Sequence, residues 1–324
     1  MSILLTGAAG FIGFHVAKAL LERGDRVVGI DNLNGYYDVR LKEARLALLR
    51  AYPGFAFAKL DVSDRDGVFA LLEHHKELCS VIHLAAQAGV RYSLENPYAY
   101  IDANVMGTLV MLEAARRIDR LTAITYASSS SVYGANRKQP FSVEDPVELP
   151  VSLYAATKRS CELLARTYSH LYGLPATGLR FFTVYGPWGR PDMAAYLFTR
   201  AILAGQPIKV FNEGRMARDF TYIDDIVAGT IAAHDRPPAA GAADRVYNLG
   251  NHRPEQLLDF IAILERLLGR TVGKELLPMQ PGDVPESFAD IEASRRDLGF
   301  EPRTTIEVGL ARFVEWYRQY HNVN

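Results

Sequence analysis

The chain contains little cysteine and carries no excess of charge. Cys79 and Cys161 are the only cysteines in 324 residues, too few for a disulfide framework, and indicate a reducing compartment. With 36 lysines and arginines against 37 aspartates and glutamates, the formal net charge is −1. No positive field would therefore attract nucleic acid or an anionic membrane, and any anionic ligand must be bound by local groups.

Long apolar segments and metal-ligand spacings are also absent from the sequence. No apolar run approaches the ~18 residues that a membrane span requires, and Met1 leads directly into an expected strand without room for a signal peptide. We therefore expect a soluble, cytoplasmic protein. The eight histidines show no HExxH or comparable spacing, so we expect no metal.

A glycine-rich turn follows the first expected strand. Residues 2–6 have the pattern of a short buried strand, the segment GAAGFIG comes next, and the helical pattern of residues 14–23 follows it. Gly7 can adopt the angles of a sharp turn, Gly10 lets a pyrophosphate approach the main chain, and Gly13 permits close packing of helix on strand. Amide groups at the helix N-terminus would then face the phosphates.

A second expected strand ends in an acidic residue. Residues 26–30 are apolar and lead to Asp31, about twenty residues beyond Gly10. A carboxylate at this place accepts hydrogen bonds from both adenosine ribose hydroxyls and repels a 2′-phosphate, so NAD is preferred over NADP. The glycine spacing departs from G-x-G-x-x-G, but the complete strand, turn, helix, strand and terminal Asp indicate a dinucleotide site rather than an ordinary turn.

Strands and helices alternate through the first half of the chain. Further strands are expected at residues 55–60, 80–84, 121–126 and 177–182, and helices at 39–50, 65–76, 98–118 and 154–171. The alternation predicts an α/β fold with a doubly wound parallel (Rossmann) sheet, in which ligands bind outside the carboxyl ends of the strands. Asp61 and Val62 would meet an adenine there, and the middle of the cofactor would be lined by Leu84, Ala85, Ala86 and Gln87.

Prolines and glycines become frequent after about residue 184, at 185–191 and 278–285. This change predicts a smaller, loop-rich C-terminal domain of residues 184–324 beside a sheet domain of residues 1–183. A helix candidate at 221–234 and a strand candidate at 246–249 indicate that a segment of about 221–250 returns to the first domain.

Tyr154 and Lys158 stand four residues apart at the start of an expected helix. In a helix they share one face, about 5–6 Å apart at Cβ. A free tyrosine has a pKa of about 10, but a neighbouring ammonium favours the phenolate and so makes a usable base. Such a pair is by itself typical of a helix surface, and the dinucleotide pattern is what favours a proton carrier.

Together these segments make the chain resemble the extended short-chain dehydrogenase/reductase family over essentially its whole length. The motifs that carry the resemblance are the glycine-rich turn, Asp31, Asp61, residues 128–134, Tyr154 to Lys158 and residues 218–225. The resemblance implies NAD bound at the sheet, a UDP-sugar in the second domain and a homodimer formed through the helical stretches 98–118 and 154–171. It also implies that Tyr154 is base and acid, Lys158 holds the nicotinamide ribose, and Ser129 bonds the reacting oxygen.

The motifs and the resemblance predict two further sets of residues. The expected cofactor residues are Gly7, Gly10, Phe11, Ile12, Gly13, Asp31, Asn32, Asp61, Val62, Leu84, Ala85, Ala86, Gln87, Asn104, Tyr154 and Lys158. The expected substrate residues are Arg91, Ser129, Ser130, Ser131, Thr183, Arg190, Val210, Phe211, Arg218 and Asp283. Arg218 would hold the UDP diphosphate, and Arg190 would share that role or approach the sugar.

The activity is indicated by the residues just before Val132. Nucleotide-sugar 4,6-dehydratases carry an Asp-Glu pair there and UDP-glucuronate decarboxylases usually a Glu, whereas this chain has Ser130 and Ser131, which leaves oxidation and re-reduction at C4. The UDP-galactose 4-epimerase pattern has Asn at the position of Thr183 and Arg at that of Gln280. Both departures argue against a neutral hexose.

Within the family the chain is most similar to the UDP-glucuronate 4-epimerase group, in residues 31–38, 87–93, 180–193 and 279–285. The resemblance implies interconversion of UDP-glucuronate and UDP-galacturonate through a transient 4-keto sugar. A uronate carboxylate needs hydrogen-bond donors, which the serine run and Thr183 offer. Another nucleotide-sugar 4-epimerase, a UDP-glucuronate decarboxylase and a non-catalytic NAD-binding regulator remain as alternatives, although Tyr154 and Lys158 argue against the last.

Overall fold

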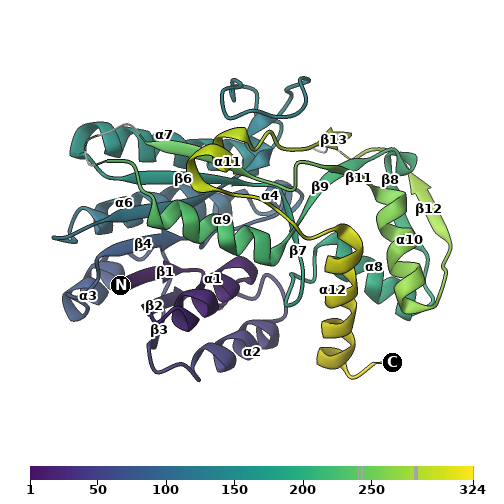
Figure 1. The fold of residues 1–324 in the computed structure, drawn as a ribbon, viewed down its shortest axis with the longest axis horizontal. Helices are drawn as coiled ribbons and strands as arrows, with labels where there is room; N and C mark the ends of the chain where they lie inside the picture. Colours follow the sequence, from purple (N-terminus) through teal and green to yellow (C-terminus); the bar gives the residue numbers. More distant parts are fainter. Residues whose placement is uncertain (240, 242–243, 281–283, 324) are drawn as a thin grey trace.

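A seven-stranded parallel sheet forms the frame of the molecule in this computed structural model, which describes residues 1–239, 241, 244–280 and 284–323 (Figure 1). The strand order is β10-β6-β5-β4-β1-β2-β3, and every neighbouring pair is parallel. The strands are β1 (Ser2–Thr6), β2 (Arg26–Asp31), β3 (Phe55–Lys59), β4 (Ser80–His83), β5 (Ala123–Ser129), β6 (Ala176–Phe181) and β10 (Arg245–Leu249). The predicted doubly wound parallel sheet is confirmed.

Helices cover both faces of this sheet. On one face lie α1 (Phe11–Glu22), α2 (Val39–Leu49) and α9 (Ile223–Asp235), and on the other lie α3 (Arg65–His74), α6 (Gly107–Ala115) and α7 (Leu153–Tyr172). Because both faces are covered, the inner strands are apolar on both sides. Ile3, Leu4 and Leu5 of β1 are completely buried.

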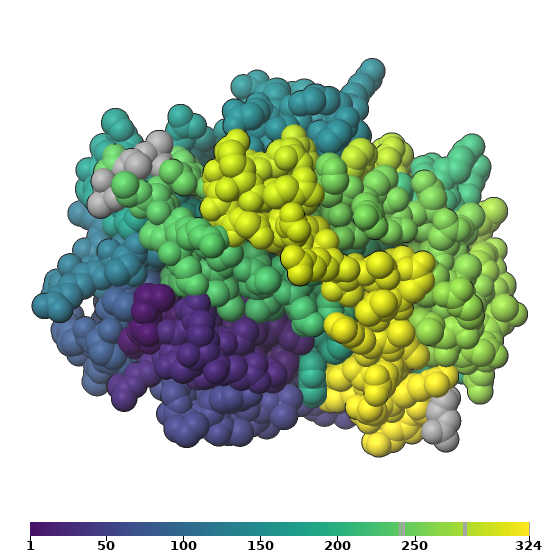
Figure 2. Space-filling view, viewed as in Figure 1, coloured from purple at the N-terminus to yellow at the C-terminus, as the bar shows by residue number. Residues whose placement is uncertain are grey.

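The second half of the chain contributes to the first-half sheet. Strand β10 pairs with β6 at the sheet edge, α9 packs beside α1, and α11 (Glu292–Leu298) packs on both α9 and β10. The link from α11 to α12 runs along α9, where the Asp225 carboxylate accepts hydrogen bonds from the N–H groups of Arg303 and Thr304, both at 3.1 Å. This C-terminal segment is yellow in the space-filling view and crosses the green surface of α9 (Figure 2).

A smaller unit is built around β9 (Ala217–Tyr222). This strand is paired with β7 (Thr183–Tyr185), β11 (Pro254–Gln256) and β13 (Glu286–Ser287), while β8 (Ile208–Phe211) pairs with β12 (Lys274–Leu277). Helices α8 (Ala194–Leu203), α10 (Leu257–Leu268) and α12 (Ile306–His321) pack around them. The core of this unit is aromatic, with Phe220 stacked on Phe260 at 4.3 Å between ring centroids.

The helix predicted at 98–118 is not one regular helix. It begins as α5 (Pro97–Tyr100), continues as the π-helical segment η1 (Ile101–Met106) and ends as α6 at Ala115, with the short α4 (Tyr92–Glu95) before it. Asn104 in the π segment accepts a hydrogen bond from the Gln87 N–H and donates to the Gln87 carbonyl and to Thr157. Such π segments are typical of functional sites, and side-chain periodicity does not reveal them.

The predicted end of one strand and the predicted start of one helix are wrong. Strand β6 ends at Phe181, and Thr183 opens β7, which pairs with β9. The helix predicted at 221–234 starts at Ile223, since Thr221 and Tyr222 still belong to β9. Within the described ranges, no helix combines the length and apolar character needed to cross a membrane.

Candidate active site

A cavity of about 980 Å³ lies between the carboxyl ends of the sheet strands and the smaller unit. Its walls come from the segments that follow β1, β2, β3, β4, β5 and β6 and from residues of β8, β9 and α8. This is the place where doubly wound sheets bind their ligands.

Most of the predicted site residues line this one cavity. They are Gly7, Gly10, Phe11, Ile12, Gly13, Asp31, Asn32, Asp61, Val62, Leu84, Ala85, Ala86, Gln87, Arg91, Ser129, Ser130, Ser131, Tyr154, Lys158, Thr183, Arg190, Phe211 and Arg218. Asn104 does not line it, because its side chain is buried behind Gln87, and Val210 lies in the core of the smaller unit. Asp283 lies outside the described residues.

The glycine-rich turn closes because its key positions have no Cβ. Gly7 has a φ of 73°, and a Cβ there would lie 2.8 Å from the backbone nitrogen of Ala85. A Cβ on Gly13 would lie 2.0 Å from the Gly7 carbonyl oxygen. Helix α1 starts at Phe11, three residues earlier than predicted, and has no acidic residue in its first turn. Its N-terminal amides face the cavity and suit a diphosphate.

Two carboxylates occupy the ends of the β2 and β3 region. Asp31 accepts hydrogen bonds from the N–H groups of Ala9 at 3.2 Å and Leu33 at 2.8 Å. Asp61 accepts from the Asn32 amide at 2.7 Å and from the Ser63 N–H at 2.9 Å. Burial alone would raise the pKa of Asp61, but these hydrogen bonds outweigh it and lower the pKa, so the group is ionised at neutral pH.

Lys42 is a cavity residue that the sequence analysis missed. Its buried ammonium lies 3.9 Å from an Asp31 carboxylate oxygen and donates to Asn34 at 3.0 Å. Burial lowers the pKa of Lys42, against the opposing attraction of Asp31. No signal marked it, since a lysine within α2 looks like any solvated helix residue.

Helix α7 brings Tyr154 and Lys158 to the cavity. Ser152 caps the helix by accepting a hydrogen bond from the Ala155 N–H at 3.1 Å, which places both residues in the first two turns. The Lys158 ammonium donates to the Ala127 carbonyl at 2.9 Å. The Tyr154 ring meets Tyr100 edge to face, with 6.0 Å between ring centroids.

The serine run begins in the last two residues of β5 and continues into a segment that packs against α7. Ser129 caps the short 3₁₀ helix η2 (Ser130–Tyr133), and its Oγ accepts a hydrogen bond from the Ser131 N–H at 3.2 Å. The same Oγ donates to the Ser131 hydroxyl at 3.2 Å. The run is therefore a turn and also presents hydroxyl groups to the cavity.

Arg190 is held by a carboxylate that the sequence analysis did not select. Its guanidinium donates to both oxygens of Asp192, at 3.0 and 2.6 Å, and Tyr36 donates to the same carboxylate at 3.1 Å. Burial opposes the charges, but the pairing lowers the pKa of Asp192 and raises that of Arg190. Tyr36 and Asp192 both line the cavity and lie in two of the segments that carried the resemblance.

Two further arginines line the cavity, Arg218 from β9 of the smaller unit and Arg91 from the segment between β4 and α4. Arg218 donates to the carbonyl groups of Ala217 at 3.0 Å and Pro285 at 3.1 Å. The Arg91 guanidinium lies over the Phe211 ring, 4.9 Å from its centroid. These cations are local groups on which an anionic ligand could be held, as the balanced net charge requires.

Histidine, cysteine and carboxylate side chains are the usual ligands of protein-bound metal ions. Among the residues whose positions are described, no three histidine, cysteine, aspartate or glutamate side chains come together as a potential metal site. His83, at the end of β4, is buried and hydrogen-bonds Thr6 at 2.8 Å.

The chain matches a known family along most of its length. Residues 3–250 match the model of the NAD dependent epimerase/dehydratase family. The chain belongs to that family. This agrees with the resemblance to extended short-chain dehydrogenases/reductases, and NAD is the cofactor that the family description names.

Relatives within this family are similar over the full chain. A probable UDP-glucuronate 4-epimerase of Rhizobium meliloti is 49% identical, with 98% of this chain and 97% of the relative covered. UDP-glucuronate 4-epimerase 4 of Arabidopsis thaliana is also 49% identical, with 99% and 76% covered. A crystal structure of UDP-glucuronic acid 4-epimerase from Bacillus cereus in complex with UDP-glucuronic acid and NAD is 36% identical and superimposes with a TM-score of 0.92, covering 99% of this chain and all of that one.

Proposed function

We propose that the chain is a UDP-glucuronate 4-epimerase that interconverts UDP-glucuronate and UDP-galacturonate using bound NAD. The observation that carries this proposal is the meeting of Tyr154, Lys158 and the serine run at one cavity, in a chain whose full-length relatives carry that name. The same cavity is lined by the expected cofactor residues at the glycine turn and by the expected substrate residues Phe211 of β8 and Arg218 of β9.

The residues present fit NAD. The glycine turn and the N-terminus of α1 would hold the diphosphate, Asp31 the adenosine ribose, Asp61 and Val62 the adenine, and Lys158 the nicotinamide ribose. Bound NAD supplies the hydride acceptor for C4 of the sugar and the donor for its re-reduction. We assign cofactor binding to residues 1–183 with the return segment of about 221–250, and UDP-sugar binding to residues 184–324.

Tyr154 moves the proton in this scheme. Its phenolate accepts the proton of the sugar 4-hydroxyl while C4 is oxidised, and the phenol returns a proton when C4 is reduced from its other face. The Lys158 ammonium lies one helical turn from Tyr154, and Ser129 would donate a hydrogen bond to the reacting oxygen. Oxidation and reduction cancel, so the reaction has no net redox change.

The serine run and Thr183 have a second task. A 4-keto uronic acid is a β-keto acid, which loses CO₂ when its C5–carboxylate bond stands perpendicular to the carbonyl plane. Hydroxyl donors that hold the charged carboxylate out of that orientation suppress the loss, because cleavage removes the charge they stabilise. Arg218 would hold the UDP diphosphate, and Arg190 lies near enough to the cavity to assist.

Product analysis tests the proposal directly. Incubation of the purified chain with UDP-glucuronate, without added NAD, should yield UDP-galacturonate as the main product. Formation chiefly of a UDP-pentose with CO₂ would instead identify a decarboxylase, and equal turnover of UDP-glucose would identify an epimerase of different specificity. Absence of turnover with every UDP-sugar would indicate a non-catalytic NAD-binding protein.

We also propose that the chain forms a homodimer through the helical layer next to the active site. Large apolar side chains on α5, η1 and α7 are exposed there although these elements pack on one another: Tyr98 is 79%, Met106 47% and Leu163 49% exposed. One side of these helices is committed to the sheet, so the exposed side suits a second copy related by a twofold axis.

A further inference from the structure

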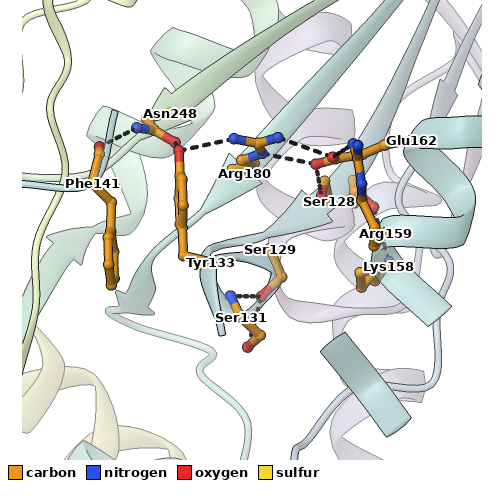
Figure 3. A network of polar contacts seen from close by, with 11 residues as sticks. Ser128, Ser129, Ser131, Tyr133, Phe141, Lys158, Arg159, Glu162, Arg180 and Asn248 are labelled. Carbon is orange, nitrogen blue, oxygen red and sulfur yellow. Dashed lines mark hydrogen bonds and ion pairs between the residues drawn. The ribbon is translucent and has the colours of Figure 1, made fainter. Parts of the chain in front are cut away.

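A buried ion pair stands behind the serine run and has no part in the proposed proton transfer. Glu162 of α7 and Arg180 of β6 are joined by two hydrogen bonds, Nε to Oε1 at 2.8 Å and Nη2 to Oε2 at 3.0 Å (Figure 3). Their side chains are only 1% and 4% exposed. Because desolvation can cancel the attraction of such a pair, its contribution to stability alone does not explain it.

This ion pair holds both ends of the segment that carries the serine hydroxyls. Before the segment, the Ser128 hydroxyl donates to Glu162 Oε1 at 2.6 Å. After it, Arg180 Nη1 donates to the Tyr133 hydroxyl at 3.0 Å, and that hydroxyl donates to Asn248 at 2.6 Å. Figure 3 shows these contacts as one continuous chain. Residues 129–132 therefore lie between two contacts made by one charged pair.

One member of the pair, Glu162, lies on the helix that carries the base. Glu162 follows Lys158 by one helical turn and Tyr154 by two on α7, so all three lie along one side of it. Lys158 adds its own hydrogen bond to Ala127, the residue before Ser128. Helix α7 and the end of β5 are thus joined by polar contacts of Lys158 and Glu162.

Tyr133 and Asn248, at the other end of the network, make further contacts. The Asn248 amide donates to the carbonyl groups of Phe141 at 2.8 Å and Asp290 at 2.9 Å. The Tyr133 ring stacks on Phe141, with 4.5 Å between centroids and planes 10° apart. These contacts fix Tyr133 and leave the serine segment little freedom to shift.

We propose that Glu162 and Arg180 are positioning residues that set the place of the Ser129 to Ser131 hydroxyls relative to Tyr154. The inference rests on the proposed function. A shift of about 1 Å in such a site can cost roughly 10²-fold in rate. The ion pair thereby also controls whether the 4-keto sugar is re-reduced or loses its carboxylate.

The competing loss of CO₂ gives this proposal a chemical readout. In the 4-keto uronate the bond between C5 and the carboxyl carbon breaks, CO₂ leaves, and the electron pair enters an enolate across C4 and C5. A proton then adds at C5, and re-reduction at C4 yields a UDP-pentose. A displaced serine segment should increase this product, which a purely structural network would leave unchanged.

The test removes the hydrogen bonds that join the ion pair to Ser128 and to Tyr133. Glu162→Gln would leave the buried Arg180 charge without its partner and is expected to destabilise the whole chain. Ser128→Ala and Tyr133→Phe instead remove one hydroxyl each and keep the pair. Each should lower kcat about tenfold or more, change KM less than about threefold, retain bound NAD and raise the share of UDP-pentose.

Arg159→Gln is the matched control. Arg159 also donates to the Glu162 carboxylate, at 2.9 Å, but it belongs to α7 itself and does not reach the serine segment. Its kinetics and product ratio should match those of the parent. If Ser128→Ala and Tyr133→Phe also keep the parent kcat and product ratio and lose only thermal stability, the positioning role is overturned. A parent chain that does not convert UDP-glucuronate would overturn the proposed function instead, and this inference with it.

Discussion

Lys158 donates a hydrogen bond from its ammonium to the carbonyl oxygen of Ala127, 2.9 Å away. Ala127 lies within β5, just ahead of the serine run, so this bond ties the first turns of α7 to the strand that supplies the hydroxyl groups. The Lys158 ammonium is therefore held in place by the sheet as well as by its own helix. Changes at this junction should affect rate more than cofactor retention.

Tyr154→Phe should abolish turnover and leave NAD bound, because the change removes only the proton carrier. A loss of roughly 10²–10⁴-fold in kcat is expected for a missing general acid and base. The control is Tyr168→Phe on the same helix. The Tyr168 hydroxyl donates to Glu113 and does not line the cavity, so its loss should not alter kcat. Activity of the Tyr154 variant above a tenth of the parent would rule out its assigned role.

Thr183→Val should lower kcat/KM for UDP-glucuronate about 10- to 150-fold, since it keeps the shape of the side chain but removes a charge-assisted hydrogen bond of ~1.5–3 kcal/mol. A UDP-pentose by-product should appear or increase, measured by chromatography of the products. Thr177→Val in β6 is the control, because that hydroxyl is buried away from the cavity. Parent kinetics without by-product in the Thr183 variant would show that the carboxylate is held elsewhere.

Arg218→Ala should raise the KM for UDP-glucuronate strongly without displacing NAD, because it removes the cation assigned to the UDP diphosphate. Steady-state kinetics and the nicotinamide released on denaturation measure the two effects. Arg215→Ala is a suitable control, since Arg215 is 74% exposed and pairs with Glu213 at the surface. An unchanged KM in the Arg218 variant would remove Arg218 from the substrate site.

Acid should destabilise the chain through its buried neutral histidines, among them His83 and His234. Burial lowers the pKa of His83 to about 3 and that of His234, which bonds Ser80 and Thr125, to about 4. The unfolded chain binds these protons near pH 6.5, so stability is complete above that pH and falls as the pH drops toward 4.

Urea unfolding at about pH 7 and about pH 5 measures this effect, to which each histidine should contribute about 2 kcal/mol. In His234→Gln the difference between the two pH values should shrink by about that amount. The exposed His74 provides the comparison, and His74→Gln should leave the difference unchanged. An equal pH dependence in all three proteins would contradict the assignment.

If the chain forms a homodimer, light scattering at micromolar concentration should give a mass twice that of one chain. Leu163→Glu should reduce the mass to that of a monomer, because it places a charge in the proposed apolar contact. Leu276→Glu, on the exposed β12 strand of the smaller unit, should leave the dimer intact. A monomeric parent chain would refute the proposal.

Local patterns in the sequence determined the fold class and the main parts of the candidate site. The glycine turn, Asp31, Tyr154 and Lys158 could be located because each depends on neighbours within a few residues: a strand end, a helix start, or one helical turn. Parallel strands then bring their carboxyl ends to one edge, so these residues were predicted to meet, and the cavity lies at that edge.

Only the tertiary structure revealed the contacts between residues that no local motif connects. Thr183 moves into a second sheet, Asn104 lies in a π segment behind Gln87, and Tyr36 reaches Asp192, which is far along the chain. No local pattern in the sequence connects Glu162 with Arg180, yet the two form a buried pair. Periodicity reports which face of an element is apolar, whereas a buried ion pair depends on the packing of a helix against a strand, and that packing is set by the whole core.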